Sequence, residues 1–302
     1  MADQEFGQLD VRYLNHAALA LPDGGELYYE DSGEGPAVTL LNNFYIVSPI
    51  WRNFTTELAK DFRLVHYDLR NQGASHPGSE PLDFMDHVED LRRLLDHLGI
   101  EQTYLVGTSI STIIAREFTL KYPERVAGLV LVGAAFSPNG GLRRKLVSRS
   151  WLASLEAGGT KQLFNHLYPL VFPDQTIHQG GTAAYLALQD NFLSLLSVSS
   201  IRENLLASLE IEDDPEALAT IANPTLIING DGDFAWSRSV IEDALARIPN
   251  SREVTLPRAG HVPFFDDPQG FQKAVAGVRD RTGAPPRPPA WIPAATPARR
   301  PR

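Results

Sequence analysis

Ser109 is the residue of this chain whose surroundings first suggest chemistry. It lies in TYLVGTSISTIIA, residues 103–115, where a short apolar run predicts a buried strand and the segment from Ile110 predicts a helix. Small residues stand two positions before and after it, at Gly107 and Ser111, so the strand can turn sharply into the helix. A residue at such a corner has a strained backbone and an outward side chain. It also meets the positive end of the helix dipole, with the Ile110 amide free to donate. The pattern predicts a nucleophilic serine.

A serine hydroxyl reacts poorly until a base removes its proton, and we expect His261 to be that base. Histidine has an ordinary pKa close to neutral pH, and His261 follows two small residues after the last predicted strand. A carboxylate must then orient the imidazole. Asp231 and Asp233 both qualify by position, although aspartates beside glycines also serve turns alone. A metal site is the other interpretation of D-x-D, but no EF-hand spacing follows, so we expect neither metal nor cofactor.

Apolar strand candidates alternate with helical segments along most of the chain, which predicts a mostly parallel sheet covered on both faces. The pattern changes to successive helices between 137 and 222, which we interpret as an inserted lid. The predicted units are therefore 1–136 and 223–282 as two parts of one core, 137–222 as the lid, and 283–302 as a tail. The predicted strands are 15–21, 26–30, 37–41, 63–67, 104–106, 126–132, 224–228 and 253–256. The predicted helices outside the elbow are 50–60, 84–98, 141–156, 160–171, 181–197, 200–210, 237–248 and 267–281.

Serine, aspartate and histidine in this order, each after a predicted strand, resemble the α/β-hydrolase fold family over about residues 12–280. The resemblance implies an α/β fold with a mostly parallel eight-stranded sheet, flanked by helices and carrying an inserted helical lid. The family pattern of glycine, two residues and aspartate selects Asp233. Haloalkane dehalogenases and epoxide hydrolases of this fold use aspartate where this chain has Ser109, so the resemblance implies acyl transfer through a serine ester.

The oxyanion hole needs a second amide besides that of Ile110. In similar enzymes it belongs to the residue after a His-Gly pair at the end of the third strand. Here Asn42 and Asn43 replace that pair, so the resemblance assigns the amide to Phe44. Asn43 tolerates the left-handed backbone that glycine adopts freely, so the hole can form with Asn43 in that conformation. Alternatively, Asn42 or Asn43 adds a side-chain donor. Ser111, where the family has glycine, is expected to crowd the contact between helix and strand.

The predicted lid is rich in aromatic residues, which suits a core as well as a substrate wall. Because a lid must cover the active site with something, we expect an apolar substrate. The predicted pocket residues are Asn42, Asn43, Tyr45, Trp151, Phe164, Tyr168, Trp236 and Val262. Of the other histidines, we expect His66, His76, His87 and His97 at strand ends, in loops and on helix surfaces.

The composition and net charge of the chain exclude several classes of function. The chain has 302 residues, 43% of them hydrophobic and 21% charged, as is ordinary for a globular enzyme. A formal net charge of −10 disfavours binding to nucleic acid or to an anionic membrane. There are no cysteines, no apolar run of membrane-spanning length and no signal-peptide pattern at the start, so we expect the cytoplasm as the site of action. The tail, 283–302, holds seven prolines, four arginines and no acidic residue, which predicts disorder or a docking segment for a proline-binding partner.

The predicted function is hydrolysis of a small hydrophobic carboxylic ester or thioester through an acyl-enzyme. Ser109 attacks, His261 moves the proton, Asp233 orients His261, and the amides of Phe44 and Ile110 hold the oxyanion. Two alternatives stay open. One is an acyltransferase or cyclase that acts on an acyl chain bound to an acyl carrier protein or coenzyme A. The other is a non-hydrolytic binding protein in which the triad is vestigial.

Overall fold

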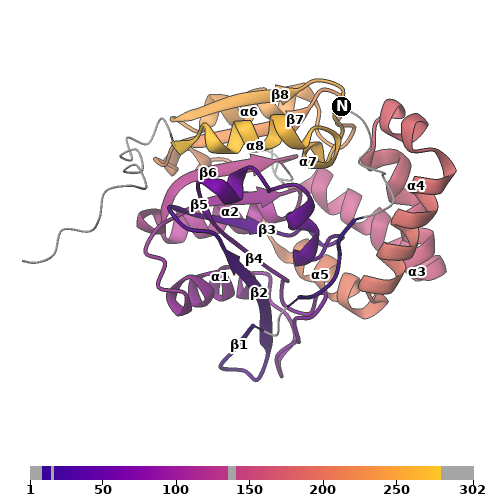
Figure 1. Ribbon diagram of the computed structural model, residues 1–302, viewed down its shortest axis with the longest axis horizontal. Helices are drawn as coiled ribbons and strands as arrows, with labels where there is room; N and C mark the ends of the chain where they lie inside the picture. Colours follow the sequence, from indigo (N-terminus) through magenta and orange to yellow (C-terminus); the bar gives the residue numbers. More distant parts are fainter. Residues whose placement is uncertain (1–8, 15–16, 135–140, 280–302) are drawn as a thin grey trace, which may run out of the picture.

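An eight-stranded sheet, in the order β1-β2-β4-β3-β5-β6-β7-β8, carries the site (Figure 1). β2 pairs antiparallel with β1 and β4, and every other neighbouring pair is parallel. This computed structural model describes residues 9–14, 17–134 and 141–279. The strands are β1 (Ala18–Ala20), β2 (Glu26–Ser32), β3 (Ala37–Leu41), β4 (Arg63–Tyr67), β5 (Thr103–Thr108), β6 (Val126–Val132), β7 (Thr225–Gly230) and β8 (Ser251–Leu256).

Helices cover both faces of the sheet. The α-helices are α1 (Asp86–His97), α2 (Ser111–Lys121), α3 (Leu142–Val171), α4 (Asp174–Leu195), α5 (Val198–Glu210), α6 (Arg238–Arg247), α7 (Pro263–Asp266) and α8 (Pro268–Ala276). The 3₁₀ helices are η1 (Ser48–Asn53), η2 (Leu58–Lys60), η3 (Pro123–Arg125) and η4 (Ala217–Thr220).

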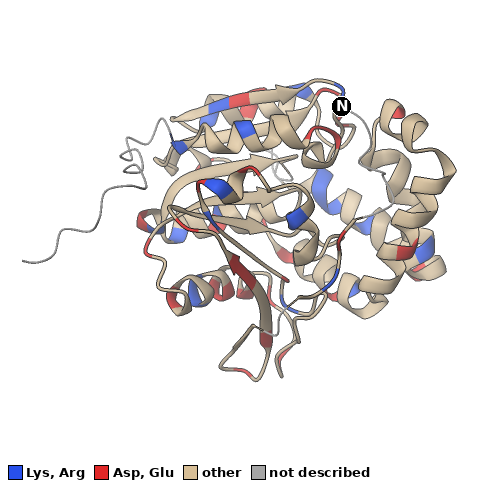
Figure 2. Ribbon diagram, viewed as in Figure 1, with Lys and Arg blue, Asp and Glu red and all other residues tan. Residues whose placement is uncertain are grey.

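Two hydrophobic clusters lie on opposite faces of the sheet. In β3, Val38 and Leu40 belong to one cluster and Leu41 to the other, because successive strand side chains point to opposite faces. The central strands β5 and β6 contain no charged residue, whereas the charged residues lie mainly on helices and loops (Figure 2). The predicted fold class is confirmed.

All the regular elements described between β6 and β7 are helices, and α3, α4 and α5 lie together beyond one end of the sheet (Figure 1). We call α3–α5 the helical insertion. Gly158 and Gly159 break α3, and Gly181 breaks α4. The first break separates the two predicted helices 141–156 and 160–171. The second explains why the prediction began at 181, because α4 already starts at Asp174 and the glycine there has φ 57°.

The predicted helix 50–60 is wrong, because the structure has the two short 3₁₀ helices η1 and η2 there. Side chains compete with the backbone for the carbonyls of this segment. Asn53 donates to the Ile50 carbonyl at 2.9 Å, and the Thr55 hydroxyl donates to the Trp51 carbonyl at 2.8 Å. The Phe54 amide therefore donates to Trp51, three residues back, as in a 3₁₀ turn.

Several expectations fall on residues outside the described ranges. The tail 283–302 and the first residues of the predicted lid, 137–140, are among them. No described helix combines the length and the apolar character that crossing a bilayer requires. Within the described residues, no three His, Asp or Glu side chains are grouped so that they could hold a metal ion.

His66, next to the end of β4, and His87, on α1, are both buried, and for His87 this contradicts the expectation of a helix surface. The His66 Nδ1 atom lies 2.8 Å from the Ser48 hydroxyl, and the His87 Nε2 atom lies 3.0 Å from Asn204 Oδ1 on α5. Burial lowers the pKa of each imidazole to about 4. Both rings are therefore neutral in the folded protein at neutral pH.

These two histidines are expected to make the fold sensitive to acid. A folded-state pKa below the unfolded value of about 6.5 gives stability that is complete above pH 6.5 and lost as pH falls toward 4. Each histidine should cost about 2 to 3 kcal/mol of unfolding free energy between pH 7 and 4.5. Urea denaturation at the two pH values measures this loss. His87→Gln should reduce the loss by about half, whereas His178→Gln, at an exposed position on α4, should not change it. Equal stability of the wild type at both pH values would contradict this account.

Candidate active site

Ser109 lies at the corner between β5 and α2 with φ 51°, in the left-handed region that side chains rarely adopt. Its amide donates to the Val132 carbonyl of β6 at 2.8 Å, and its own carbonyl accepts from the Thr112 hydroxyl at 2.6 Å. A Cβ atom added at Gly107 would lie 2.6 Å from the Ser111 carbonyl oxygen, so only glycine fits there. The structure thus has the strained corner that the sequence predicts.

His261 connects Ser109 to Asp233. Its Nε2 atom lies 2.8 Å from Ser109 Oγ, and its Nδ1 atom lies 3.0 and 3.2 Å from the two Asp233 carboxylate oxygens. An ionised carboxylate can only accept a hydrogen bond, so the neutral imidazole carries its proton on Nδ1. The Nε2 lone pair then accepts from the Ser109 hydroxyl. All three side chains are buried or nearly so, and they are the three residues that we selected from the sequence.

Asp231 does not contact His261. Its Oδ1 accepts from the Arg258 amide at 2.7 Å, so this carboxylate serves the backbone of the histidine loop. Asp233 lies in the turn after β7, where it also accepts from the Ala235 amide at 2.8 Å. Of the two aspartates left open by position, the geometry therefore favours Asp233.

The amides of Phe44 and Ile110 make no hydrogen bond to any group in the described part of the chain, so both are available to an oxyanion. The left-handed backbone expected at Asn43 is wrong, because its φ is not positive. Instead, Gln72 donates to the Asn43 carbonyl at 2.7 Å and the Ser111 hydroxyl donates to the Asn42 carbonyl. Ser111 therefore anchors the loop after β3 to the elbow, a role that a glycine could not have.

The predicted pocket position of Asn42 is wrong. Its side chain is fully buried below the loop, where its amide nitrogen donates to Asp68 Oδ1 at 3.2 Å and to Gln72 Oε1 at 3.1 Å. Its oxygen accepts from the Trp51 indole at 2.8 Å. Both the nitrogen and the oxygen of the Asn42 side chain are therefore hydrogen-bonded within the core and not directed to the cavity. In this loop, the Phe44 amide and Asn43 remain as the groups that can meet a substrate. The Asn43 side-chain oxygen accepts from the Tyr45 amide at 2.8 Å.

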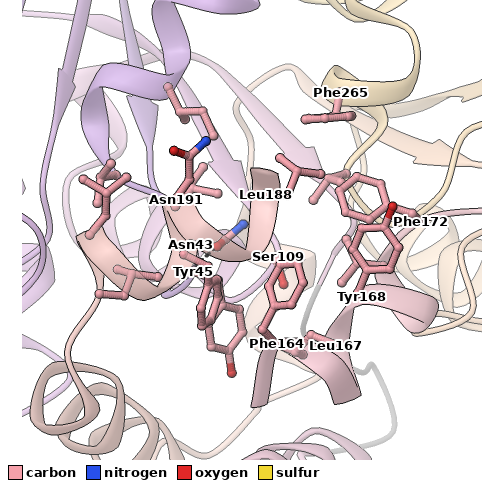
Figure 3. A pocket seen from close by; sticks show the side chains of 18 of the residues that line it. Asn43, Tyr45, Ser109, Phe164, Leu167, Tyr168, Phe172, Leu188, Asn191 and Phe265 are labelled. Carbon is pink, nitrogen blue, oxygen red and sulfur yellow. Dashed lines mark hydrogen bonds between the residues drawn. The ribbon is translucent and has the colours of Figure 1, made fainter. Parts of the chain in front are cut away.

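A cavity of about 130 Å³ opens beside Ser109 and is walled almost entirely by apolar side chains (Figure 3). Both Ser109 and His261 line this cavity, so a molecule bound in it would contact the reactive hydroxyl directly. Tyr45 packs edge-to-face on Trp151 and stacks against Phe192, which joins the loop after β3 to the helical insertion. The predicted residues that line the cavity are Asn43, Tyr45, Trp151, Phe164, Tyr168 and Val262.

Trp236 does not line the cavity, so that prediction is also wrong. The turn after Asp233 directs Trp236 toward the start of α6, where it forms a small separate cluster with Ala235 and Val240. Other lining residues were not predicted as pocket residues. Leu9 and Val11 are the clearest case, because the polar composition of residues 1–11 predicts a loose segment with no part in a pocket. Asn53 fixes residues 9–11 by two hydrogen bonds with the Asp10 backbone, at 2.9 and 3.0 Å, and no local pattern in the sequence predicts these bonds. Further lining residues on the insertion and α7 include Leu167, Val171, Leu188, Asn191, Leu195, Phe264 and Phe265, together with Phe172 and Phe192 from the aromatic residues of the predicted lid.

Comparison with known proteins agrees with this fold. The family described as alpha/beta hydrolase fold matches residues 36–268, most of the chain. The chain belongs to the α/β-hydrolase fold family. Among solved structures, a hydrolase from Pseudomonas aeruginosa PA01 is 27% identical with a TM-score of 0.77, over 89% of this chain and 99% of that one. The predicted family membership is confirmed.

Two curated relatives show the range of the family. One is RutD of Pseudomonas savastanoi pv. phaseolicola, named as a candidate carbamate hydrolase, which is 27% identical over 83% of this chain and 96% of its own. The other is haloalkane dehalogenase 2 of Mycobacterium bovis, which is 26% identical over 83% of this chain and 90% of its own. Together with the fold, these relatives support a hydrolase.

Proposed function

We propose that this α/β hydrolase cleaves a carboxylic ester or thioester with a hydrophobic acyl or alcohol part, through a serine acyl-enzyme. The observation that carries the proposal is the continuous hydrogen-bonded series from Asp233 through His261 to Ser109, which ends in an apolar cavity. A carboxylate–imidazole–hydroxyl series of this geometry activates a serine for acyl transfer. The dehalogenase relative does not suggest halide displacement here, because a serine occupies the elbow.

The mechanism follows from the positions of the donors. Ser109 Oγ attacks the carbonyl carbon while its proton passes to His261 Nε2, and Asp233 stabilises the resulting imidazolium. The amides of Phe44 and Ile110 hold the oxyanion. They are pre-organised, because hydrogen bonds from Ser111 and Gln72 fix the loop that carries Phe44. His261 returns the proton to the leaving alcohol or thiol, and water then attacks the acyl-enzyme with His261 as the base.

The test combines covalent labelling with a series of p-nitrophenyl esters. A fluorophosphonate should react at Ser109 of the wild type, as peptide mapping would show. Each methylene that enters the cavity should contribute about 0.8 kcal/mol, or roughly fourfold in kcat/KM, until the cavity is full. Rates that do not rise with acyl length would contradict the assignment of the apolar cavity to the substrate.

The same experiment separates the two alternatives. At a low concentration of acceptor alcohol, a hydrolase should still release mainly the free acid, whereas an acyltransferase would release mainly an ester product. A protein without fluorophosphonate labelling and without turnover would have a vestigial triad and serve as a binding protein.

A further inference from the structure

The loop that carries His261 is held on two sides by different parts of the fold. On the core side, the Arg258 amide donates to Asp231 Oδ1 at 2.7 Å. On the other side, the loop meets the corner between α3 and α4, where the His261 amide donates to the Val171 carbonyl at 3.0 Å. The backbone of the histidine is therefore bonded directly to the helical insertion.

Asp266, at the end of α7, adds a second connection between this loop and the insertion. Its Oδ2 accepts from the Gly260 amide at 2.7 Å, next to His261, and its Oδ1 accepts from the Thr176 hydroxyl on α4 at 2.6 Å. The Thr176 side chain is buried, and burial raises the pKa of the Asp266 carboxyl. A largely desolvated carboxylate depends on such donors, so loss of either one should make Asp266 reorient.

The corner fits against the loop without spare room. A Cβ atom added at Gly260 would lie 2.5 Å from the Val171 carbonyl oxygen and 2.8 Å from Pro173 Cδ. The same corner also faces the cavity, because Val171 and Phe172 line it. The Phe172 ring lies 5.0 Å from that of Phe265, and both stand at one side of the cavity (Figure 3). One short segment thus touches the histidine loop and the space for the substrate.

We propose that Thr176 and Asp266 are positioning residues for His261, and that through them the corner Val171–Pro173 couples the filling of the cavity to the placement of the imidazole. The coupling rests on the proposed function. An acyl chain that packs against Phe172 holds the corner against the loop and keeps His261 Nε2 in line with Ser109. Acyl length then raises kcat as well as lowering KM, because part of the binding energy is used to orient the base.

The decisive variant is Thr176→Val, which removes the hydroxyl donor at nearly constant volume. We expect kcat for long-chain p-nitrophenyl esters to fall about tenfold with little change in KM, because a small displacement of the base slows proton transfer without altering the cavity wall. The rise of kcat with acyl length should also be lost. Thr176→Ser, which keeps the donor, should restore both properties. The NMR titration of the His261 ring should move in the valine variant and return with serine.

The outcomes separate cleanly. If Thr176→Val keeps the wild-type kcat, acyl-length dependence and His261 titration, the coupling is wrong, while labelling of Ser109 leaves the proposed function intact. If the wild type neither turns over esters nor reacts with fluorophosphonate, the proposed function fails, and the NMR titration still reports on the positioning of His261. Should the valine variant fold poorly by circular dichroism, Asp266→Ala replaces it, because alanine removes both the acceptor for the Gly260 amide and the acceptor for the Thr176 hydroxyl. Wild-type behaviour of that variant would equally overturn the proposal.

Discussion

Replacing Ser109 or His261 by alanine is expected to lower kcat for p-nitrophenyl esters by about five to six orders of magnitude, and the double variant should be no worse than either single one. Ser109 Oγ and His261 Nε2 are 2.8 Å apart and act in a single proton transfer, so the loss of one side chain also removes the catalytic function of the other. Non-additivity distinguishes this arrangement from two residues that contribute independently.

Steady-state kinetics of the three variants, with circular dichroism to verify folding, measures the effect. Ser150→Ala and His178→Gln are matched controls, because both positions are exposed on the insertion. They should stay within about twofold of the wild type, as surface substitutions usually do. Losses that multiply in the double variant would show that Ser109 and His261 do not work as one unit, and the proposed mechanism would have to be abandoned.

The second large effect concerns the orienting carboxylate. Asp233→Asn is expected to lower kcat about 10⁴-fold, because an amide can donate to the imidazole and so favours the wrong tautomer. Asp231→Asn is the matched control, two residues away in the same turn. It retains an oxygen that can accept from the Arg258 amide, so the loss should not exceed about tenfold.

The ratio of the two losses is the measurement, since both variants change one carboxylate to an amide in one turn. A larger loss of kcat for Asp231→Asn than for Asp233→Asn would show that Asp233 is not the residue that orients His261. Equal losses would indicate that the turn as a whole, and not one hydrogen bond to His261, determines activity.

The helical insertion shows how far local patterns reach. The break at Gly158 and Gly159 separates two predicted helices, because glycine at positive φ stops a helix wherever it stands. The prediction of a helix at 50–60 was wrong because it depended on contacts that the local pattern does not show. There the side chains of Asn53 and Thr55 took carbonyls that a helix needs, and an apolar spacing does not register that competition.

The sequence by itself predicted the residue types of the candidate site. Small residues around Ser109 allow a sharp corner, and the common direction of parallel strands places Ser109, His261 and either Asp231 or Asp233 at the same edge of the sheet. The geometry of the corner depends on only a few neighbouring residues, and the shared edge follows from the common direction of the parallel strands. They do not depend on which side chains pack against which.

Only the tertiary structure decided what surrounds that chemistry. Asn42 turns away from the cavity because Trp51 and Asp68 offer it partners, and Leu9 and Val11 enter the cavity because Asn53 holds the segment between them. Thr176 and Asp266 meet across 90 residues of chain. Such contacts are fixed by the packing of separate segments against one another, and no periodicity within one segment encodes the surface that another will present to it.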